Sequence, residues 1–433
     1  MSLWLRAVLG FGAVALMFTW VWVEQSPSLM LAILNLAIIS AVMALGVNIQ
    51  WGYAGLFNVG IMGFAALGGV AAVLVSRPPV MSAVAAGGTG LLAALAIFLA
   101  LIALLVVLAK WLRPGWRRTI VLAVVVLGGL YLLRQFYDPA VIAIEADDPA
   151  SSGFLGGLGL PILFSWLVGG AFAAGVAWLI GKVALGLRSD YLAIATLGIS
   201  EIIIAMIKNE DWLTRGVKNV TGLPRPVPFE TDLQQAPWFI EAVQSLYANR
   251  ILRLPDEDQA DALRDAVIEA SSIFVKLAYT GLFASVLLIV LLLCVLALAS
   301  PWGRMVRAIR DNEVSAAAMG KNVTKRHLQI FVVGSAVVGI AGAMLTTLDG
   351  QFTPGSYQPL RFTFLIWVMV IVGGSGNNLG AVLGAFLIWF LWVEVEPLGQ
   401  WLMVNATEWM PAGDPLREHL RDSAQYMRLL TMG

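Results

Sequence analysis

Residues 274–299 read FVKLAYTGLFASVLLIVLLLCVLALA, a run of 26 residues in which Lys276 is the single charged side chain. A helix needs about 20 apolar residues to cross the hydrocarbon core of a bilayer, so this stretch is long enough to span a membrane. The whole 433-residue chain shares this bias: it is 59% hydrophobic and 12% charged, with a mean hydropathy of +0.84. A soluble domain carries about 25% charged residues. The composition therefore excludes a soluble globular protein.

Ten further apolar runs recur along the chain, and together they predict one all-α polytopic membrane domain over residues 1–433. Backbone groups in lipid must be hydrogen-bonded within the structure that crosses it, which favours helices. No alternating pattern of about ten residues indicates a membrane barrel. The eleven expected spans are residues 3–23, 28–48, 57–76, 83–109, 118–134, 158–181, 191–207, 274–299, 328–348, 360–372 and 379–395.

The distribution of charge between the connections predicts the orientation. Residues 110–118 contain four basic residues and no acid, and residues 300–327 contain six basic residues and two acids. Short connections rich in Lys and Arg stay in the cytoplasm. Residues 135–157 contain four acids and no basic residue, and residues 208–272 contain eleven acids and seven basic residues. We expect these two segments to be external, which places the N-terminus in the cytoplasm.

The external segment 208–272 is too long and too polar for a hairpin, and three prolines between residues 224 and 228 stiffen its first half. Its second half, residues 256–273, begins with acids after Pro255 and places Leu263, Val267 and Ile268 on one face. This spacing predicts a short amphipathic helix at the outer surface.

No cluster of residues indicates an enzyme. Lys plus Arg equals Asp plus Glu at 27 each, so charge does not point to nucleic acid. Cys294 is the single cysteine, and His327 and His419 are expected on opposite sides of the membrane. No HExxH motif or Walker glycine loop occurs, so we expect no metal, no cofactor and no ATP hydrolysis by this chain.

The cytoplasmic connection at residues 301–327 reads PWGRMVRAIRDNEVSAAAMGKNVTKRH. A simple turn would need only a few residues, whereas this connection predicts a helix over residues 304–319, closed by Gly320 as a C-cap. Such a helix would be presented to a cytoplasmic partner. A basic connector that merely obeys the positive-inside rule is the alternative.

Two segments are rich in glycine: residues 48–69, NIQWGYAGLFNVGIMGFAALGG, and residues 369–386, MVIVGGSGNNLGAVLGAF. Missing side chains let helices approach closely, and they also permit a helix to break around residues 51–58. Both interpretations stay open: close helix packing, or a broken helix that lines a substrate path. The second is possible because unwound backbone at membrane depth is tolerated only where it faces protein or a water-filled cavity.

Acids within the apolar runs have different expected roles. Asp190 begins a helix near Arg188, where the helix dipole favours a carboxylate. Glu201 lies deeper in the same span, where a charge facing lipid is costly, so we expect it to contact protein or to line a pathway. Glu394 and Glu396 are expected to mark the end of the last span.

Four segments together resemble the larger of the two paired permease subunits of branched-chain amino acid importers, an ATP-binding-cassette family with urea and amide relatives. Residues 188–202, RSDYLAIATLGISEI, match its RxDYxAIxTLG pattern, and residues 48–69 and 369–386 are similar to its Gly-rich segments. The helix expected at residues 304–319, with Gly320, resembles the family's coupling loop, whose short helix occupies a groove of the ATPase subunit.

The resemblance implies broken helices, import of branched-chain amino acids, urea or short amides, and a location in the cell inner membrane. It implies that ATP is bound by a separate subunit. The implied partners are a second homologous permease, cytoplasmic ATPase subunits and a periplasmic solute-binding protein, with no nucleic acid. The implied pathway residues are Tyr53, Asn58, Thr196 and Glu201, and the implied ATPase-coupling residues are Arg307, Arg310, Glu313, Ala316, Ala317 and Gly320.

Two departures from the family are visible. Residues 80–157 exceed its usual connection, and we expect an insertion with two extra spans at the periphery. The family ends with one further span, whereas this chain stops at residues 426–433, YMRLLTMG, so we expect a truncated C-terminus. An ion- or proton-coupled carrier that works alone, with Glu201 as its coupling acid, is the alternative function. The long cytoplasmic connection favours the importer.

Overall fold

The computed structural model describes residues 3–147, 153–251, 253, 255–411 and 415–423. Within these residues, eight helices are long and apolar enough to cross a membrane, and three shorter apolar helices accompany them. They coincide with the eleven expected runs, which confirms the all-α polytopic fold. The eleven are α1 Leu3–Glu24, α2 Pro27–Val47, α3 Ile61–Ser76, α4 Met81–Trp111, α5 Trp116–Glu145, α6 Leu163–Ala184, α7 Ser189–Asn209, α11 Asp256–Ala299, α14 Val323–Asp349, α15 Pro359–Gly373 and α16 Asn378–Ala406.

The centre of the molecule is formed by α2, α3, α6 and α14, which pack against one another. Glycines set the separation of these helices. A Cβ atom on Gly68 of α3 would lie 1.9 Å from the carbonyl oxygen of Gly339 in α14, and one on Gly342 would lie 2.0 Å from that of Ala65. Any side chain would push the helices apart, so close packing is the role of the glycines at the α3–α14 contact.

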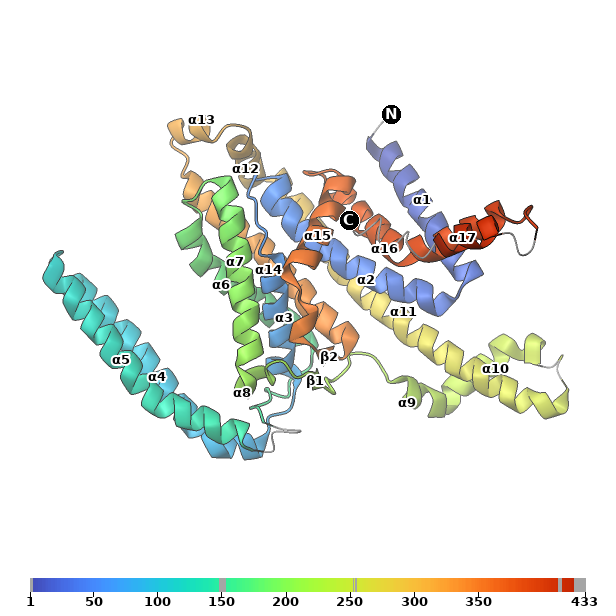
Figure 1. Ribbon diagram of the computed structural model, residues 1–433, viewed down its shortest axis with the longest axis horizontal. Helices are drawn as coiled ribbons and strands as arrows, with labels where there is room; N and C mark the ends of the chain where they lie inside the picture. Colours follow the sequence, from blue (N-terminus) through green and yellow to red (C-terminus); the bar gives the residue numbers. More distant parts are fainter. Residues whose placement is uncertain (1–2, 148–152, 252, 254, 412–414, 424–433) are drawn as a thin grey trace.

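The hairpin of α4 and α5 lies at the edge of the molecule (Figure 1), and most of its residues are exposed. Helix α5 continues to Glu145, beyond Arg134, where the expected span ends. Ala140 and Ile144, one turn apart, pack against Gly87 of α4. This apolar contact extends the helix through Pro139.

The segment expected to be external, residues 208–272, contains the short helices α8 Asp211–Thr214, α9 Glu230–Gln235 and α10 Pro237–Ile251, and the strand β1 Val220–Thr221. β1 pairs antiparallel with β2 Gln351–Phe352, with Val220 opposite Phe352. A 3-10 turn, η2 Pro354–Ser356, then leads from β2 towards α15. The pairing therefore ties the external segment to the α14–α15 connection.

The prediction of a separate amphipathic helix over residues 256–273 is wrong, because α11 runs without interruption for 44 residues, from Asp256 to Ala299. Residues 269–273 contain neither Gly nor Pro, so nothing in the sequence stops the helix there. At 1.5 Å per residue it is about 66 Å long, roughly twice the thickness of the hydrocarbon core. Its first turns therefore extend the span beyond the membrane.

The connection between α11 and α14, expected in the cytoplasm, forms two helices, α12 Pro301–Asp311 and α13 Glu313–Ala318, so the single helix predicted over residues 304–319 is wrong. The break is at Asn312, which is extended and whose side chain accepts a hydrogen bond from the Ser315 amide at 2.9 Å. Asparagine favours this capping position over a helix interior. The predicted cap at Gly320 is confirmed: its φ is +76°, and the Lys321 amide donates to the Ala316 carbonyl.

Helix α16 continues to Ala406, so the prediction that Glu394 and Glu396 mark the end of the last span is wrong. Glu394 is fully buried and accepts a hydrogen bond of 2.5 Å from the side-chain amide of Gln25, which follows α1. This partner at the α1–α2 corner explains how the span tolerates the carboxyl group. A last helix, α17 Pro415–Ser423, follows, and residues 426–433, on which the expected truncation was based, lie outside the described residues.

Candidate functional site

The first Gly-rich segment breaks the path of the chain between α2 and α3. After α2, the π-helix η1 Asn48–Gly52 widens the last turn, and residues 53–60 are not helical. Gly55 adopts a φ of +71° in this stretch. The predicted break around residues 51–58 is therefore confirmed.

The unwound backbone faces protein and is hydrogen-bonded there. The Asn58 side chain donates to the Gln50 side chain at 2.9 Å and accepts from the Gly60 amide at 2.9 Å. The Val59 amide donates to the hydroxyl of Thr196 in α7 at 3.0 Å. Two of the four expected pathway residues, Asn58 and Thr196, thus meet at the break, where their polar atoms bond to the protein itself.

Sequence analysis did not single out Asn48, although it is the fully buried centre of this region. Its side-chain oxygen accepts a hydrogen bond of 2.8 Å from the Gly376 amide, and its nitrogen donates to the Asn378 side chain at 2.9 Å. Gly376 has a φ of +80° and lies in the turn between α15 and α16. The two Gly-rich segments, far apart in the sequence, therefore meet. The sequence signal that could have identified Asn48 is its polar amide side chain at the end of an apolar run.

Arg310 joins α12 to the same region, because its guanidinium donates to the carbonyl oxygen of Gly52 at the end of η1. Arg307, one turn earlier, has another contact: it donates to the Leu298 carbonyl of α11 at 3.0 Å. Of the two arginines singled out in the sequence, one therefore contacts the broken helix and the other contacts the end of the preceding span.

Helix α13 has a buried side and an exposed side. Ala316 is 8% exposed and packs with Ile309 and Val323. Ala317 is exposed, as are Val314 and Met319, at 80% and 79%. Glu313 is exposed in the first turn, where the helix dipole favours its charge. The adjacent alanines, equivalent in the sequence, therefore differ: Ala316 holds the loop together, and Ala317 faces outward at the end of the molecule that carries α12 and α13 (Figure 1).

The other two expected pathway residues are Tyr53, at the start of the unwound segment, and Glu201 of α7. Tyr53 is half-buried directly after η1, and its amide donates to the Asn48 carbonyl at 3.1 Å. Glu201 is exposed and lines a groove of about 890 Å³ whose other charged residues are Lys208 and Arg361. We call this hollow, formed by α7, α15 and α16, the Glu201 groove.

Three aromatic side chains close the space beside the break. The ring of Trp367 in α15 lies 4.7 Å from that of Trp51 and 4.5 Å from that of Phe57. The Trp367 indole also donates to the Asn58 carbonyl at 3.1 Å. Because such rings are large and rigid, this aromatic cluster of Trp51, Phe57 and Trp367 fixes α15 against the unwound segment.

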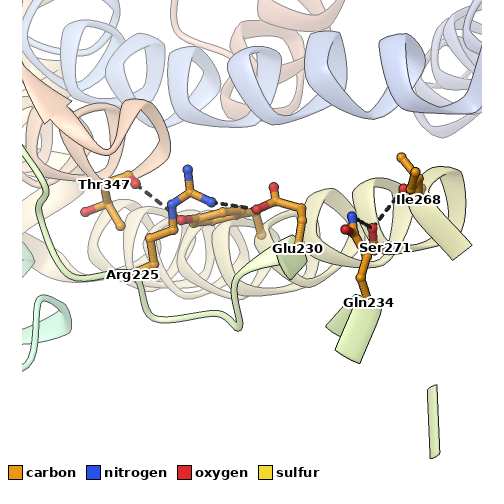
Figure 2. Close-up of polar contacts among 7 residues, drawn as sticks. Arg225, Glu230, Gln234, Ile268, Ser271 and Thr347 are labelled. Carbon is orange, nitrogen blue, oxygen red and sulfur yellow. Dashed lines mark hydrogen bonds and ion pairs between the residues drawn. The ribbon is translucent and has the colours of Figure 1, made fainter. Parts of the chain in front are cut away.

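Polar contacts hold the connection between α7 and α11, as Figure 2 shows. Arg225 forms an ion pair of 2.9 Å with Glu230, and the Gln234 side chain donates to the Ser271 hydroxyl of α11 at 3.0 Å. The Arg225–Glu230 pair lies within the connection between α7 and α11, and the Gln234–Ser271 bond holds α9 against α11. Among the described residues, no group of three or more His, Cys, Asp or Glu residues is arranged to hold a metal ion.

A family model described as the permease component of branched-chain amino acid transport systems matches residues 120–411. The chain is 29% identical over 224 residues to the high-affinity branched-chain amino acid transport system permease protein LivM of Escherichia coli (strain K12), covering 51% of this chain and 48% of that protein. It is 34% identical over 116 residues to the probable branched-chain amino acid transport permease protein LivM of Methanocaldococcus jannaschii, covering 26% of this chain and 34% of that protein.

The comparison also extends to a sugar transport system. The chain is 30% identical over 130 residues to the xylose transport system permease protein XylH of Escherichia coli (strain K12), covering 28% of this chain and 33% of that protein. The chain spans about half the length of the two enterobacterial LivM proteins that it matches. No solved structure matches the chain.

Proposed function

Because the chain belongs to the family of permease components of branched-chain amino acid transport systems, we propose that it is the transmembrane permease subunit of an ATP-driven importer. The solute is a branched-chain amino acid, with urea or a short amide as the second candidate. A periplasmic binding protein delivers it, and separate ATPase subunits bind ATP in the cytoplasm. The chain lies in the inner membrane with its N-terminus in the cytoplasm.

The observation that carries this proposal is the contact between α12 and η1. Arg310 links the cytoplasmic connection to Gly52, and Asn48 links the same turn to Gly376. A movement of α12 driven by an ATPase would therefore act on both broken segments through direct hydrogen bonds. A connector that served only to reverse the chain would need no such contact.

The exposed side of α13 supports an ATPase partner. Val314, Ala317 and Met319 present an apolar surface at the end of the molecule expected in the cytoplasm, and water disfavours large exposed apolar side chains. The Glu201 groove supports a second permease subunit as a partner, for a different reason. It faces outward between α7, α15 and α16, and a homologous subunit covering it would enclose its charged side chains.

The test uses Ala317→Trp. This substitution leaves the buried contacts of Ala316 in place, whereas overfilling a fitted interface costs about 1–3 kcal/mol. At 1.4 kcal/mol per tenfold change, ATPase association should weaken by roughly tenfold or more. The matched control is Ala260→Trp, an exposed position in the outer part of α11 that should leave association unchanged.

The measurement is the amount of ATPase that copurifies with the membrane subunits, together with leucine-stimulated ATP hydrolysis. Equal retention and equal stimulation in both variants would contradict the docking role of α13. Leucine uptake that proceeds without any ATPase would contradict the importer and favour the ion-coupled carrier. The ligand of the binding protein decides between branched-chain amino acids and urea or short amides.

A further inference from the structure

A second hollow lies among the helices on the other side of α15 from the Glu201 groove. It has a volume of about 200 Å³, and it is lined by residues of α2, α3, α14, α15 and α16 and of the connection between β2 and α15. A water molecule occupies about 30 Å³ in the liquid, so the hollow has the volume of roughly seven waters. That is enough for one small amino acid. We call it the Asp349 cavity.

Asp349 is the only charged side chain that lines this cavity in the described part of the chain. It is the last residue of α14 and is exposed, and its carboxylate forms no hydrogen bond or ion pair with the described residues. A carboxylate in the last helical turn is disfavoured by the negative end of the helix dipole. A cation bound there would be attracted by both the carboxylate and the helix end.

The tyrosine beside this carboxylate stays neutral. Tyr357 lies between β2 and α15, and burial raises the pKa of its hydroxyl. Its oxygen lies 2.8 Å from the Thr346 hydroxyl, so it is already hydrogen-bonded within the protein. The charge that a solute meets in the cavity is therefore a single negative one.

The remaining walls are largely apolar. Leu36, Ile39 and Met43 occupy one side of α2 at helical spacing, and Phe362 and Ile366 face the cavity from α15. A branched aliphatic side chain placed between these two helices would leave water for an apolar surface, which is favourable in proportion to the area buried.

The cavity is lined by residues close in sequence to β2 and to the unwound segment. Asp349 directly precedes Gly350 and β2, which pairs with the external segment. Met62, at the start of α3, lines the other end, close in sequence to the unwound segment. Trp367 of the aromatic cluster directly follows Ile366, which lines the cavity, in α15.

We propose that the Asp349 cavity binds one branched-chain amino acid, with its ammonium group on the Asp349 carboxylate and its aliphatic side chain between α2 and α15. The hydroxyl of Ser356, which also lines the cavity, supplies a neutral donor for the solute carboxylate. This assignment rests on the proposed function, because the family supplies the solute class and the cavity supplies the binding groups.

The experiment uses the full chain in lipid nanodiscs and photo-leucine, the diazirine analogue of leucine, as the probe. After illumination, peptides from α2 and α15 should carry the label. L-Leucine should compete for labelling, whereas 4-methylpentanoate, which has the same aliphatic chain and carboxylate but no ammonium group, should not. This comparison needs no variant, so it remains informative if a substitution disturbs folding.

Asp349→Asn removes the negative charge and keeps the size of the side chain. It should raise the photo-leucine concentration for half-maximal labelling by about ten- to a hundredfold, since hydrogen bonds to charged groups are among the strongest in proteins. The matched control, Asp258→Asn, changes an exposed residue in the outer part of α11 and should leave labelling unchanged.

Equal competition by 4-methylpentanoate, unchanged labelling of Asp349→Asn, or labelling confined to the Glu201 groove would each overturn the assignment. An assembled importer that takes up leucine while its cavity stays unlabelled would refute this site and leave the proposed function standing. Labelling of the cavity in a complex that transports no amino acid would contradict the proposed function alone.

Discussion

Gly68→Ala adds one methyl group to the contact between α3 and α14, at a point where the backbones touch. The new Cβ atom would lie 1.9 Å from the Gly339 carbonyl oxygen and 2.9 Å from the Ala343 amide nitrogen. Both neighbours are backbone atoms, so neither can turn away as a side chain would. The helices must separate by about an ångström to relieve the overlap.

The expected cost follows from this geometry. Overpacking a filled interior destabilises a protein by about 1–3 kcal/mol, while replacing glycine by alanine within a helix contributes about 0.5–1 kcal/mol in the opposite direction. Gly175→Ala isolates the second effect, because nothing lies within 4 Å of a Cβ atom at that exposed position in α6. We expect Gly68→Ala to destabilise the protein and Gly175→Ala to stabilise it slightly.

The assay is thermal unfolding of the full chain in one detergent at one scan rate, since an irreversible transition depends on the rate of heating. A change of 1 kcal/mol shifts Tm by roughly 2–4 °C in domains of about 150–250 residues, and by less in a longer chain. Gly68→Ala should therefore unfold a few degrees below Gly175→Ala. If the two variants shifted equally, the α3–α14 contact would have room for a side chain, and the packing argument for these glycines would be refuted.

Two further predictions concern coupling and orientation. Arg310→Gln removes the charged donor to the Gly52 carbonyl, so the complex should retain its ATPase but lose uptake per ATP hydrolysed; unchanged coupling would show that this contact transmits nothing. In intact cells, an impermeant thiol reagent should label a cysteine introduced at Asp147 and should not label one introduced at Arg117. The native Cys294 is buried and stays unreactive. The reverse pattern would overturn the orientation.

The sequence alone was sufficient to predict the spans and the glycine turns. An apolar run of sufficient length becomes a helix in lipid because every backbone hydrogen bond lies within the segment, so the prediction needs no knowledge of neighbours. Gly320 is similar: a glycine after a helix-forming stretch satisfies the last carbonyls by a local turn. The break after α2 also followed from local sequence, since Gly52, Gly55 and Gly60 lie within nine residues.

Local reasoning failed where a distant partner changes the outcome. From the sequence, Glu394 is expected at the end of a span, whereas in the structure it is buried and accepts a hydrogen bond from Gln25. Ala316 and Ala317 are the same residue type at adjacent positions, so the sequence does not distinguish them. Ile309 and Val323 pack against Ala316, which leaves Ala317 facing outward.

The candidate site depended on tertiary structure for the same reason. Asn48 reaches Gly376 and Arg310 reaches Gly52 across 328 and 258 positions of the chain, and residues from five helices line the Asp349 cavity. Periodicity and composition describe each helix by itself, whereas these contacts depend on how closely the helices pack. That separation is set by the glycines of several segments acting together.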